Sequence, residues 1–264
     1  MRANKLIQSF NNKHDKTLVN AWMSLPDSYA AEILGHSGVD SVTIDLQHGM
    51  IDVGTLIPML QAVSATPAVP LVRVSNCEPS LIMKVLDAGA YGIICPQVDN
   101  VEICQRFVDA CYYPPQGNRS FGPSRGLLYG GSDYVDNHAS EILPLAMIES
   151  REAVDNLESI LRVPNLKGIY IGPNDLALSY GYRPGGGASL ELEEIIDNIL
   201  HLAQTRVKFV GIFCKDEQEA ASRAKQGFHF VTPGNDAGAL RKAYQHFCSV
   251  IHAQEINAVN HTGY

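Results

Sequence analysis

Short apolar segments rich in β-branched residues recur along the chain and alternate with longer segments of helical period. Eight such runs lie at residues 18–25, 41–47, 68–74, 91–98, 143–150, 166–173, 207–214 and 228–234. Most of them are continuously apolar rather than alternating, which is typical of parallel strands that are buried on both faces. The pattern therefore predicts eight parallel strands in the interior of the protein.

The intervening segments have the spacing of amphipathic helices. Residues 28–38 carry apolar positions at helical intervals and end on a glycine, and the same pattern recurs at 80–90, 151–162, 189–204 and 217–228. Eight strands, each followed by a helical segment, is the count of a (β/α)8 TIM barrel. An open doubly wound sheet is the competing prediction, although no GxGxxG motif follows the first strand.

The 264 residues suit one large α/β domain or two small ones, and no composition shift marks a linker. We expect a single barrel domain over 1–264, with an N-terminal helix at about 1–17 and a C-terminal helix and tail at about 236–264. Residues 112–140 form a long connection rich in Gly, Pro, Ser and Arg, which we expect to be a lid, a binding loop or an oligomer contact. Residues 181–189 are glycine-rich but lack the GxxxxGK[ST] phosphate motif, so we expect a flexible loop there.

The composition excludes several classes of partner. A formal net charge of −8 argues against nucleic-acid binding, which requires a basic surface. The first residues are too polar for a signal peptide, and no apolar run approaches the length of a membrane helix, so we expect a cytoplasmic protein without membrane contacts. Six cysteines without a CxxC pair are expected to be reduced, mostly buried thiols.

Polar side chains stand at the ends of successive predicted strands. They are Asp45 and His48 after the second strand, Arg73 on the third, Gln97 on the fourth, Glu149 on the fifth and Asp175 beyond the sixth. Each has a local alternative: Asp45 as a cap, Arg73 as a surface ion-pair partner, Glu149 as a charge favoured at a helix N-terminus. Because the carboxyl ends of barrel strands meet on one face, we predict that these residues form one site.

The residue types indicate metal-assisted chemistry. The carboxylates Glu149 and Asp175 suit a hard divalent cation such as Mg²⁺ or Mn²⁺, which would act as a Lewis acid on a chelating substrate. Gly172 and Pro173 form a turn, after which Asn174 and Asp175 begin a helix whose free N–H groups could hold a substrate carboxylate. An ordinary turn with an Asx cap is the alternative there.

Two further side chains are candidates for charge stabilisation and proton transfer. Arg73 offers a fixed positive charge for an oxyanion that develops on a carbonyl, and His48 beside Asp45 could be a general base, directly or through a bound water. No GxSxG motif supports a serine nucleophile, and no predicted strand ends on a lysine: Lys208 begins its strand, and Lys215 is a weak Schiff-base candidate. The pattern favours enolate chemistry over covalent catalysis.

With these residues in place, the chain resembles the HpcH/HpaI aldolases, the class II metal-dependent pyruvate aldolases. The matching motifs are DLQHG, LVRV, LDAGAYGIICPQVDN, YPPQGNRSFGP, MIESREAVDNLESIL and GIYIGPNDLALSYGY. The resemblance implies a (β/α)8 barrel that exchanges its last helix with a partner subunit, commonly in hexamers built as trimers of dimers. It also implies reversible retro-aldol cleavage of 4-hydroxy-2-oxo acids to pyruvate and an aldehyde through a metal-bound pyruvate enolate.

The resemblance also implies roles for individual residues. Glu149 and Asp175 would hold the metal (Mg²⁺ or Mn²⁺, with Co²⁺ as a further option), Arg73 would stabilise the enolate oxygen, and His48 with Asp45 would move the proton through a metal-bound water. The substrate-binding set would comprise Arg73, Gln97, Gly172, Pro173, Asn174 and Asp175, together with Asp87 reaching in across a subunit interface.

The chain departs from the aldolase pattern at two positions. Met147 stands where related enzymes often have glutamine, and Gln47 stands in DLQHG where GEH is frequent. The reaction is therefore open to an alternative with the same metal site: oxaloacetate decarboxylation, or enolate trapping as in the related macrophomate synthase branch. A non-catalytic metabolite-binding barrel is a third hypothesis. Arg119 and Arg125 in the long connection could bind a distal substrate carboxylate or form interface ion pairs.

Overall fold

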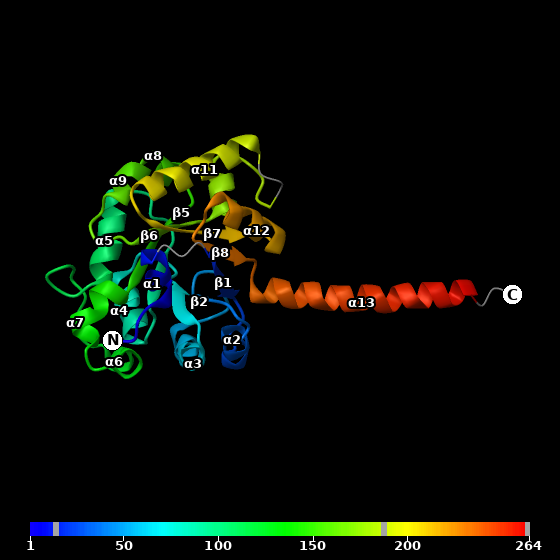
Figure 1. The fold of residues 1–264 in the computed structure, drawn as a ribbon, viewed down its shortest axis with the longest axis horizontal. Helices are drawn as coiled ribbons and strands as arrows, with labels where there is room; N and C mark the ends of the chain where they lie inside the picture. The colour runs from blue at the N-terminus through cyan, green and yellow to red at the C-terminus, as the bar shows by residue number, and fades with distance from the viewer. Residues whose placement is uncertain (13–15, 186–188, 262–264) are drawn as a thin grey trace.

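The eight predicted strands form a closed, all-parallel barrel in the computed structural model, which describes residues 1–12, 16–185 and 189–261 (Figure 1). The strands are β1 (Leu18–Met23), β2 (Ser41–Asp45), β3 (Val69–Arg73), β4 (Gly92–Cys95), β5 (Leu143–Ile148), β6 (Gly168–Ile171), β7 (Phe209–Cys214) and β8 (Phe230–Pro233). Each strand pairs with the next, and β8 pairs with β1 to close the sheet. The (β/α)8 prediction is confirmed, and the open-sheet alternative is wrong.

Helices cover the outside of the barrel. They are α2 (Ser28–Gly35), α3 (Val53–Ser64), α4 (Pro79–Asp87), α5 (Val101–Cys111), α8 (Arg151–Asp155), α9 (Leu157–Leu161), α10 (Pro173–Ser179), α11 (Leu190–Thr205) and α12 (Glu217–Gln226). Several begin at a polar side chain that accepts a hydrogen bond from a free N–H of the first turn. Asp27 caps α2, Asp52 caps α3, Asn100 caps α5 and Asp216 caps α12. These caps fix where each helix starts after its strand.

The expectations for the connecting and N-terminal segments require adjustment. The long connection 112–140 contains two helices, α6 (Ser124–Gly130) and α7 (Tyr134–Glu141), so it is less irregular than its Gly, Pro and Ser content indicates. The N-terminal helix α1 spans only Lys5–Asn11. Its Leu6 side chain packs into the lower end of the barrel interior, which is the end where the strands begin. The glycine-rich connection lies partly outside the described residues.

The barrel interior combines an apolar cluster with a small hydrogen-bonded polar group. Its lower part is a cluster of inward-facing side chains that includes Leu18, Val69, Leu71, Leu143, Leu145, Phe209 and Phe230. Beside this cluster, Asn20 donates to Thr232 at 2.9 Å and accepts from Ser41 at 2.7 Å and Thr43 at 2.9 Å. These buried polar groups satisfy one another within the otherwise apolar interior.

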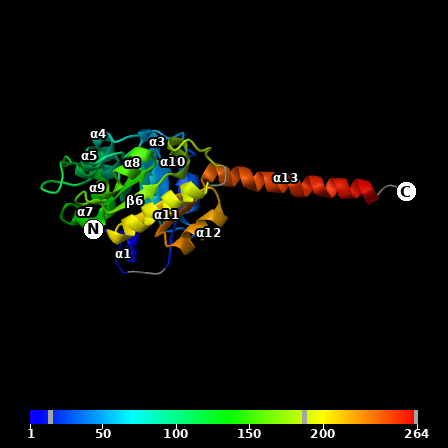
Figure 2. The same ribbon diagram turned by 90° about the horizontal axis from the view of Figure 1, so that it is seen from above.

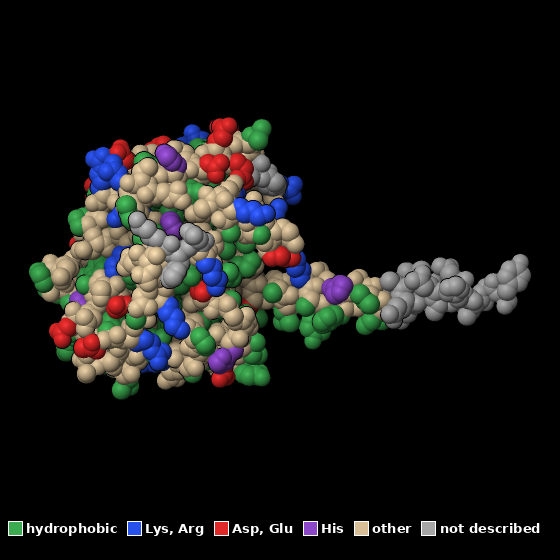
Figure 3. All heavy atoms as spheres, in the orientation of Figure 1, with side chains coloured by type: hydrophobic (Ala, Val, Ile, Leu, Met, Phe, Trp, Pro, Cys, Tyr) green, Lys and Arg blue, Asp and Glu red, His purple; other side chains and the backbone are tan. Residues whose placement is uncertain are grey.

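Helix α13 (Asp236–His261) follows β8 and projects away from the barrel (Figures 1 and 2). Large apolar side chains lie exposed along it, and Figure 3 shows hydrophobic groups on its described part; they are Leu240, Tyr244, Phe247, Val250 and Ile251. A projecting helix with this much exposed apolar surface is typical of a contact surface. Exchange of this helix with a partner subunit stays a prediction.

Two expectations drawn from the composition concern the cysteines and membrane-spanning helices. All six cysteines are free thiols, and four of them are buried, as predicted. Within the described ranges, no helix combines the length and the apolar character that crossing a bilayer requires.

Candidate active site

The centre of the site is a buried ion pair between Asp45 and Arg73. The register of β2 and β3 places the two residues directly opposite each other at the upper ends of their strands. Arg73 donates from Nε to Asp45 Oδ1 at 2.8 Å and from Nη2 to Oδ2 at 2.5 Å, and Trp22 Nε1 donates to Oδ2 at 3.2 Å. Burial by itself would raise the pKa of Asp45, but the hydrogen bonds and charge of Arg73 outweigh it and hold that pKa below its usual value. Asp45 is therefore a carboxylate that orients the guanidinium.

The contact between Asp45 and His48 differs from the expected one. The carboxylate accepts backbone N–H groups, from Gln47 at 2.9 Å and from His48 at 3.3 Å, so Asp45 shapes the turn after β2. Among the described residues no hydrogen bond joins the His48 imidazole to Asp45, whose two carboxylate oxygens accept from Arg73, Trp22 and backbone N–H groups. The imidazole is exposed to the cavity described below. Among the described residues, the side-chain oxygen of Gln47 is buried without a hydrogen-bond partner.

A cavity of about 220 Å³ opens above this ion pair. Asp45, His48, Arg73, Gly172, Pro173, Asn174 and Asp175 line it together with Trp22, Ser24, Met147, Phe213 and Asn235. The structure thus brings together seven of the residues that the sequence nominated. Trp22, Met147 and Phe213 give the cavity an apolar wall, and the aromatic ring of Trp22 lies 4.9 Å below the Arg73 guanidinium carbon.

Glu149 lies behind the cavity, just after β5, with only 5% of its surface exposed. The backbone N–H of Gln97 donates to its Oε1 at 2.7 Å, and Gln97 holds a left-handed conformation with φ of 55° to reach it. Burial, reinforced by the negative charge of Asp175, raises the pKa of Glu149 to about 7 despite the opposing Gln97 N–H and Arg73 charge. Gln97 contributes through its backbone here, and its own side chain is exposed.

The surroundings of Glu149 and Asp175 fit a divalent cation. Gly172 at the start of α10 packs so closely that an added Cβ would lie 2.7 Å from both Glu149 Oε2 and Met147 Cε, so only glycine leaves this space free. Two carboxylates whose charges repel each other beside such a space are the ligands that Mg²⁺ and Mn²⁺ prefer. The described residues contain no group of three or more acidic, His or Cys side chains that could hold a metal ion by themselves.

One anchor of the site was missed by the sequence reasoning. Asp236, the first residue of α13, accepts hydrogen bonds from the N–H and Oγ of Ser24 at 2.9 and 2.7 Å and from the N–H of Leu25 at 3.0 Å. It thereby ties the end of β1 to the start of α13 beside the cavity. The sequence does contain an indication of this anchor. Asp236 belongs to the GND segment that follows β8, so it is an acidic residue near a strand end, as Asp45 and Glu149 are.

Asp87, Arg119 and Arg125 lie at the opposite end of the barrel. Asp87 is the last residue of α4, and Arg119 donates to it at 2.7 Å and to Tyr134 at 3.0 Å while only 1% exposed. Arg125 donates to the Ala88 carbonyl at 2.7 Å and to Ser64 at 2.9 Å. Since α3 and α4 end at the lower face, neither arginine lines the cavity of its own chain. A role for Arg119 and Arg125 in a pocket shared with a neighbouring subunit, or in interface ion pairs, stays a prediction. The role of Asp87 in a neighbouring subunit stays a prediction.

Comparisons with known proteins place the chain in a family. The sequence model of the family described as HpcH/HpaI aldolase/citrate lyase matches residues 19–243. A hydroxypyruvate/pyruvate aldolase from Rhizorhabdus wittichii is 43% identical over 225 residues, covering 84% of this chain and 89% of the relative. A 5-keto-4-deoxy-D-glucarate aldolase from Enterobacter sp. is 34% identical, covering 86% and 89%.

A solved structure extends the agreement to the fold. An HpcH/HpaI aldolase/citrate lyase family protein from Burkholderia cenocepacia superposes with a TM-score of 0.89 at 28% identity, covering 95% of this chain and 100% of that one. The strand order, the placement of the polar residues at one rim and these matches lead to one conclusion. The chain belongs to the HpcH/HpaI aldolase/citrate lyase family and is a carbon–carbon lyase of the aldolase type.

Proposed function

We propose that this protein is a divalent-metal-dependent lyase that cleaves a 4-hydroxy-2-oxo acid reversibly to pyruvate and an aldehyde. The observation that supports this most strongly is the pairing of two devices at one rim. One is the buried carboxyl of Glu149, which lies beside Asp175 and has a pKa raised to about 7. The other is the Arg73 guanidinium held in place by Asp45. The first device suits a cation and the second suits a developing oxyanion.

Glu149 and Asp175 would hold the cation, either Mg²⁺ or Mn²⁺, with Co²⁺ as a further option. When bound, the cation supplies Lewis-acid polarisation of the carboxylate and keto oxygens of a chelating 2-oxo acid. The Gln97 N–H fixes the orientation of the Glu149 carboxylate, and Gly172 leaves room beside it. The backbone N–H groups at the start of α10, around Asn174 and Asp175, would bind the substrate carboxylate.

Arg73 would stabilise the negative charge that develops on the keto oxygen. Its Nε and one Nη2 hydrogen are committed to Asp45, which leaves Nη1 and the remaining Nη2 hydrogen for the cavity. Because the carboxylate and the Trp22 ring fix the plane of the guanidinium, these donors need little reorganisation when the charge forms. Asp45 would therefore act through Arg73.

His48 would exchange the proton of the substrate hydroxyl, directly or through a water molecule. Its imidazole lines the cavity, and its backbone N–H donates to Asp45. This backbone contact positions the residue without engaging the ring nitrogens. Abstraction of this proton starts cleavage of the adjacent carbon–carbon bond and leaves the pyruvate half as an enolate, which then takes up a proton.

The test is a side-by-side assay of pyruvate release from 4-hydroxy-2-oxopentanoate and from oxaloacetate. Activity on the first substrate should be abolished by chelator, be restored by Mn²⁺ or Mg²⁺, and fall sharply in His48→Asn. Release from oxaloacetate alone, insensitive to His48→Asn, would favour the decarboxylase alternative. Pyruvate binding that is insensitive to chelator, without turnover of either substrate, would favour a metabolite-binding barrel.

We also propose that the active form is a homo-oligomer in which α13 docks on another copy of the chain. The exposed apolar side chains of α13 support this, since nothing in the described part of the same chain covers them. In such an assembly Asp87, whose side chain remains 25% exposed, would lie where a neighbouring subunit could use it. The hexamer that the family resemblance implies is the specific form we expect.

A further inference from the structure

Two cysteines meet where the segments that follow β3 and β4 run side by side. The Val74 N–H donates to the Ile94 carbonyl at 3.1 Å, so the two segments are still paired at the residue before Cys95, which ends β4. Cys77 lies a few residues beyond Val74 on the other segment. The Cys77 and Cys95 side chains pack in the same apolar cluster and share a hydrogen bond. The fold thus brings together two thiols from different βα units.

The surroundings of these two thiols differ from each other. Cys77 is partly exposed, and the hydrogen bond from Cys95, together with the nearby charge of Arg106, lowers the pKa of Cys77 despite its partial burial. Cys95 is buried, and the same hydrogen bond together with its burial raises the pKa of its thiol. A solvent-accessible thiol of lowered pKa beside a second thiol is the arrangement of redox-active cysteines. Cys77 is therefore suited to attack an oxidant, and Cys95 is suited to complete a disulfide.

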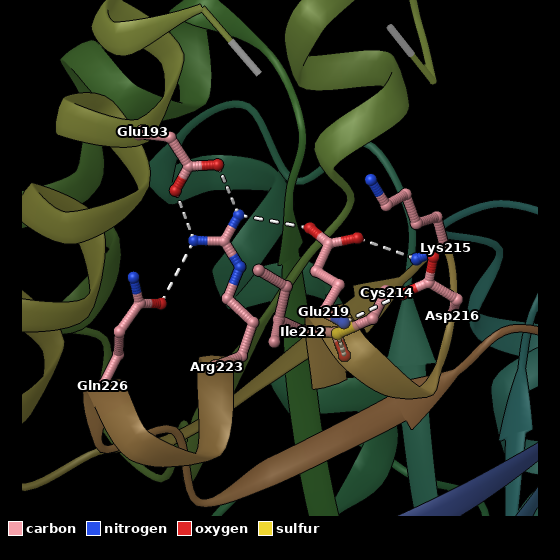
Figure 4. A network of polar contacts seen from close by, with 8 residues as sticks. All are labelled: Glu193, Ile212, Cys214, Lys215, Asp216, Glu219, Arg223 and Gln226. Atoms are coloured by element: carbon pink, nitrogen blue, oxygen red, sulfur yellow. Dashed lines mark hydrogen bonds and ion pairs between the residues drawn. The ribbon is translucent and has the colours of Figure 1, made fainter. Parts of the chain in front are cut away.

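The other buried cysteines contrast with Cys77. Burial raises the pKa of Cys104 to about 12 and that of Cys111 further. Cys214 ends β7 and lies beside the polar network of Arg223 (Figure 4), and burial raises its pKa to about 12 as well. Thiols of this kind stay protonated and behave as small apolar side chains. The buried cysteines thus serve as internal controls for the reactivity of Cys77.

The two thiols adjoin the residues that hold the candidate site in place. Cys95 lies two residues before Gln97, whose N–H donates to Glu149 at 2.7 Å, and Cys77 follows Arg73 after a short turn. An S–S bond is about 2 Å long, which is shorter than the separation of hydrogen-bonded thiols, so its formation draws the two segments together. Because Gln97 needs a left-handed backbone conformation to reach Glu149, a shift at Cys95 changes that hydrogen bond. Oxidation of the thiols therefore acts on Glu149 from outside the cavity.

We propose that Cys77 and Cys95 form a reversible disulfide with hydrogen peroxide as the oxidant, and that this disulfide weakens cation binding by Glu149 and Asp175. The second part rests on the proposed metal-dependent function. The Cys77 thiolate attacks one peroxide oxygen and the O–O bond breaks, which gives a sulfenic acid and, with the proton that Cys77 released, one water. The Cys95 sulfur then attacks Cys77 Sγ, the S–O bond breaks, and hydroxide leaves with the Cys95 proton as a second water. Two thiols are oxidised and one peroxide is reduced.

The first measurement locates the disulfide by mass spectrometry. The metal-free protein is treated with hydrogen peroxide, alkylated, and digested with trypsin and Glu-C, because cleavage after Glu102 separates Cys95 from Cys104. We expect peptide 74–78 to be joined to peptide 85–102, and the joined product to disappear after treatment with dithiothreitol. A wild-type digest without this joined product would overturn the proposal.

Three variants test the order of the two steps. In Cys95→Ala the sulfenic acid at Cys77 has no thiol to resolve it, so it should persist and react with dimedone. Cys77→Ser should take up no dimedone at Cys95, because the buried thiol is the weaker nucleophile. Cys214→Ser removes a buried thiol at the end of another strand and should form the disulfide as wild type does. Cys95→Ala without dimedone at Cys77, or labelling of Cys95 in Cys77→Ser, would contradict the assigned roles.

The second measurement follows the candidate metal site by calorimetry, after the peroxide has been removed. The Mn²⁺ affinity of the oxidised wild type should be at least about tenfold lower than that of the reduced protein, and should recover after reduction and removal of dithiothreitol. Peroxide should leave the affinity of Cys77→Ser unchanged. A disulfide that forms without a change in Mn²⁺ affinity would overturn the coupling to Glu149. If the reduced protein binds no Mn²⁺ and cleaves no 4-hydroxy-2-oxo acid, the proposed function fails and the coupling with it, whereas the peptide mapping still decides whether the disulfide forms.

Discussion

Glu149→Gln should make the metal-free protein more stable at pH 8 while it abolishes metal-dependent activity. The amide keeps the size of the side chain and can still accept the Gln97 N–H, which lies 2.7 Å from Oε1 in the wild type. What the substitution removes is the negative charge that burial and Asp175 disfavour. The variant therefore isolates the energetic cost of placing this proposed metal-ligand carboxylate behind the cavity.

The magnitude follows from the pKa of Glu149. A rise from 4.5 in the unfolded chain to about 7 in the folded protein corresponds to about 3 kcal/mol. Because the folded pKa is raised, this carboxyl destabilises the fold progressively as pH rises from about 4.5 to about 7, and the cost is complete above that range. The variant should thus exceed wild type by about 3 kcal/mol at pH 8, and by less than about 1 kcal/mol at pH 5.

The assay is thermal unfolding in chelator at pH 5 and pH 8, at equal protein concentrations. For a chain of this size, about 3 kcal/mol corresponds to a rise in Tm of roughly 6 °C or more at pH 8. Saturating Mn²⁺ should then raise the Tm of wild type and not that of the variant. Glu152→Gln, an exposed acid one turn further along the chain, is the control and should show little pH-dependent change. A variant no more stable than wild type at pH 8 would refute the reasoning.

Three further predictions concern the ion pair, the glycine beside the proposed metal site and the projecting helix. Arg73→Ala leaves Asp45 buried without its cation and should lower the free energy of unfolding by about 3–5 kcal/mol, with kcat reduced about a hundredfold or more. Adding Asp45→Asn should recover part of the stability in urea unfolding but none of the activity, and equal stabilities of the single and double variants would contradict this. Gly172→Ala should weaken Mn²⁺ binding at least about tenfold by calorimetry with the circular dichroism spectrum retained, because its Cβ would lie 2.7 Å from Glu149 Oε2. Tyr244→Asp with Phe247→Asp should lower the assembly mass in light scattering, and an unchanged mass would count against α13 as an interface.

The hydrophobic periodicity of the sequence was sufficient to predict the architecture and the location of much of the candidate site. Each observed strand lies within its predicted run, and seven predicted site residues line one cavity. This succeeded because parallel barrel strands are buried on both faces, so their sequence is continuously apolar and a polar residue at a strand end is conspicuous. The same logic missed the helices of the long connection, whose short glycine-containing sequences carry a weak periodic signal.

Only the tertiary structure shows which side chains of the site contact each other. Asp45 is three residues from His48 and far from Arg73 in sequence, yet the register of β2 and β3 places Asp45 opposite Arg73, and the guanidinium takes both carboxylate oxygens. Strand patterning determines which face a side chain occupies, whereas register and closure determine which side chains meet across strands. The pattern of the sequence was enough to predict the barrel and the residue types at its rim. Only the closed fold showed that Asp45 orients Arg73 and that Arg119 and Arg125 lie at the opposite end of the barrel.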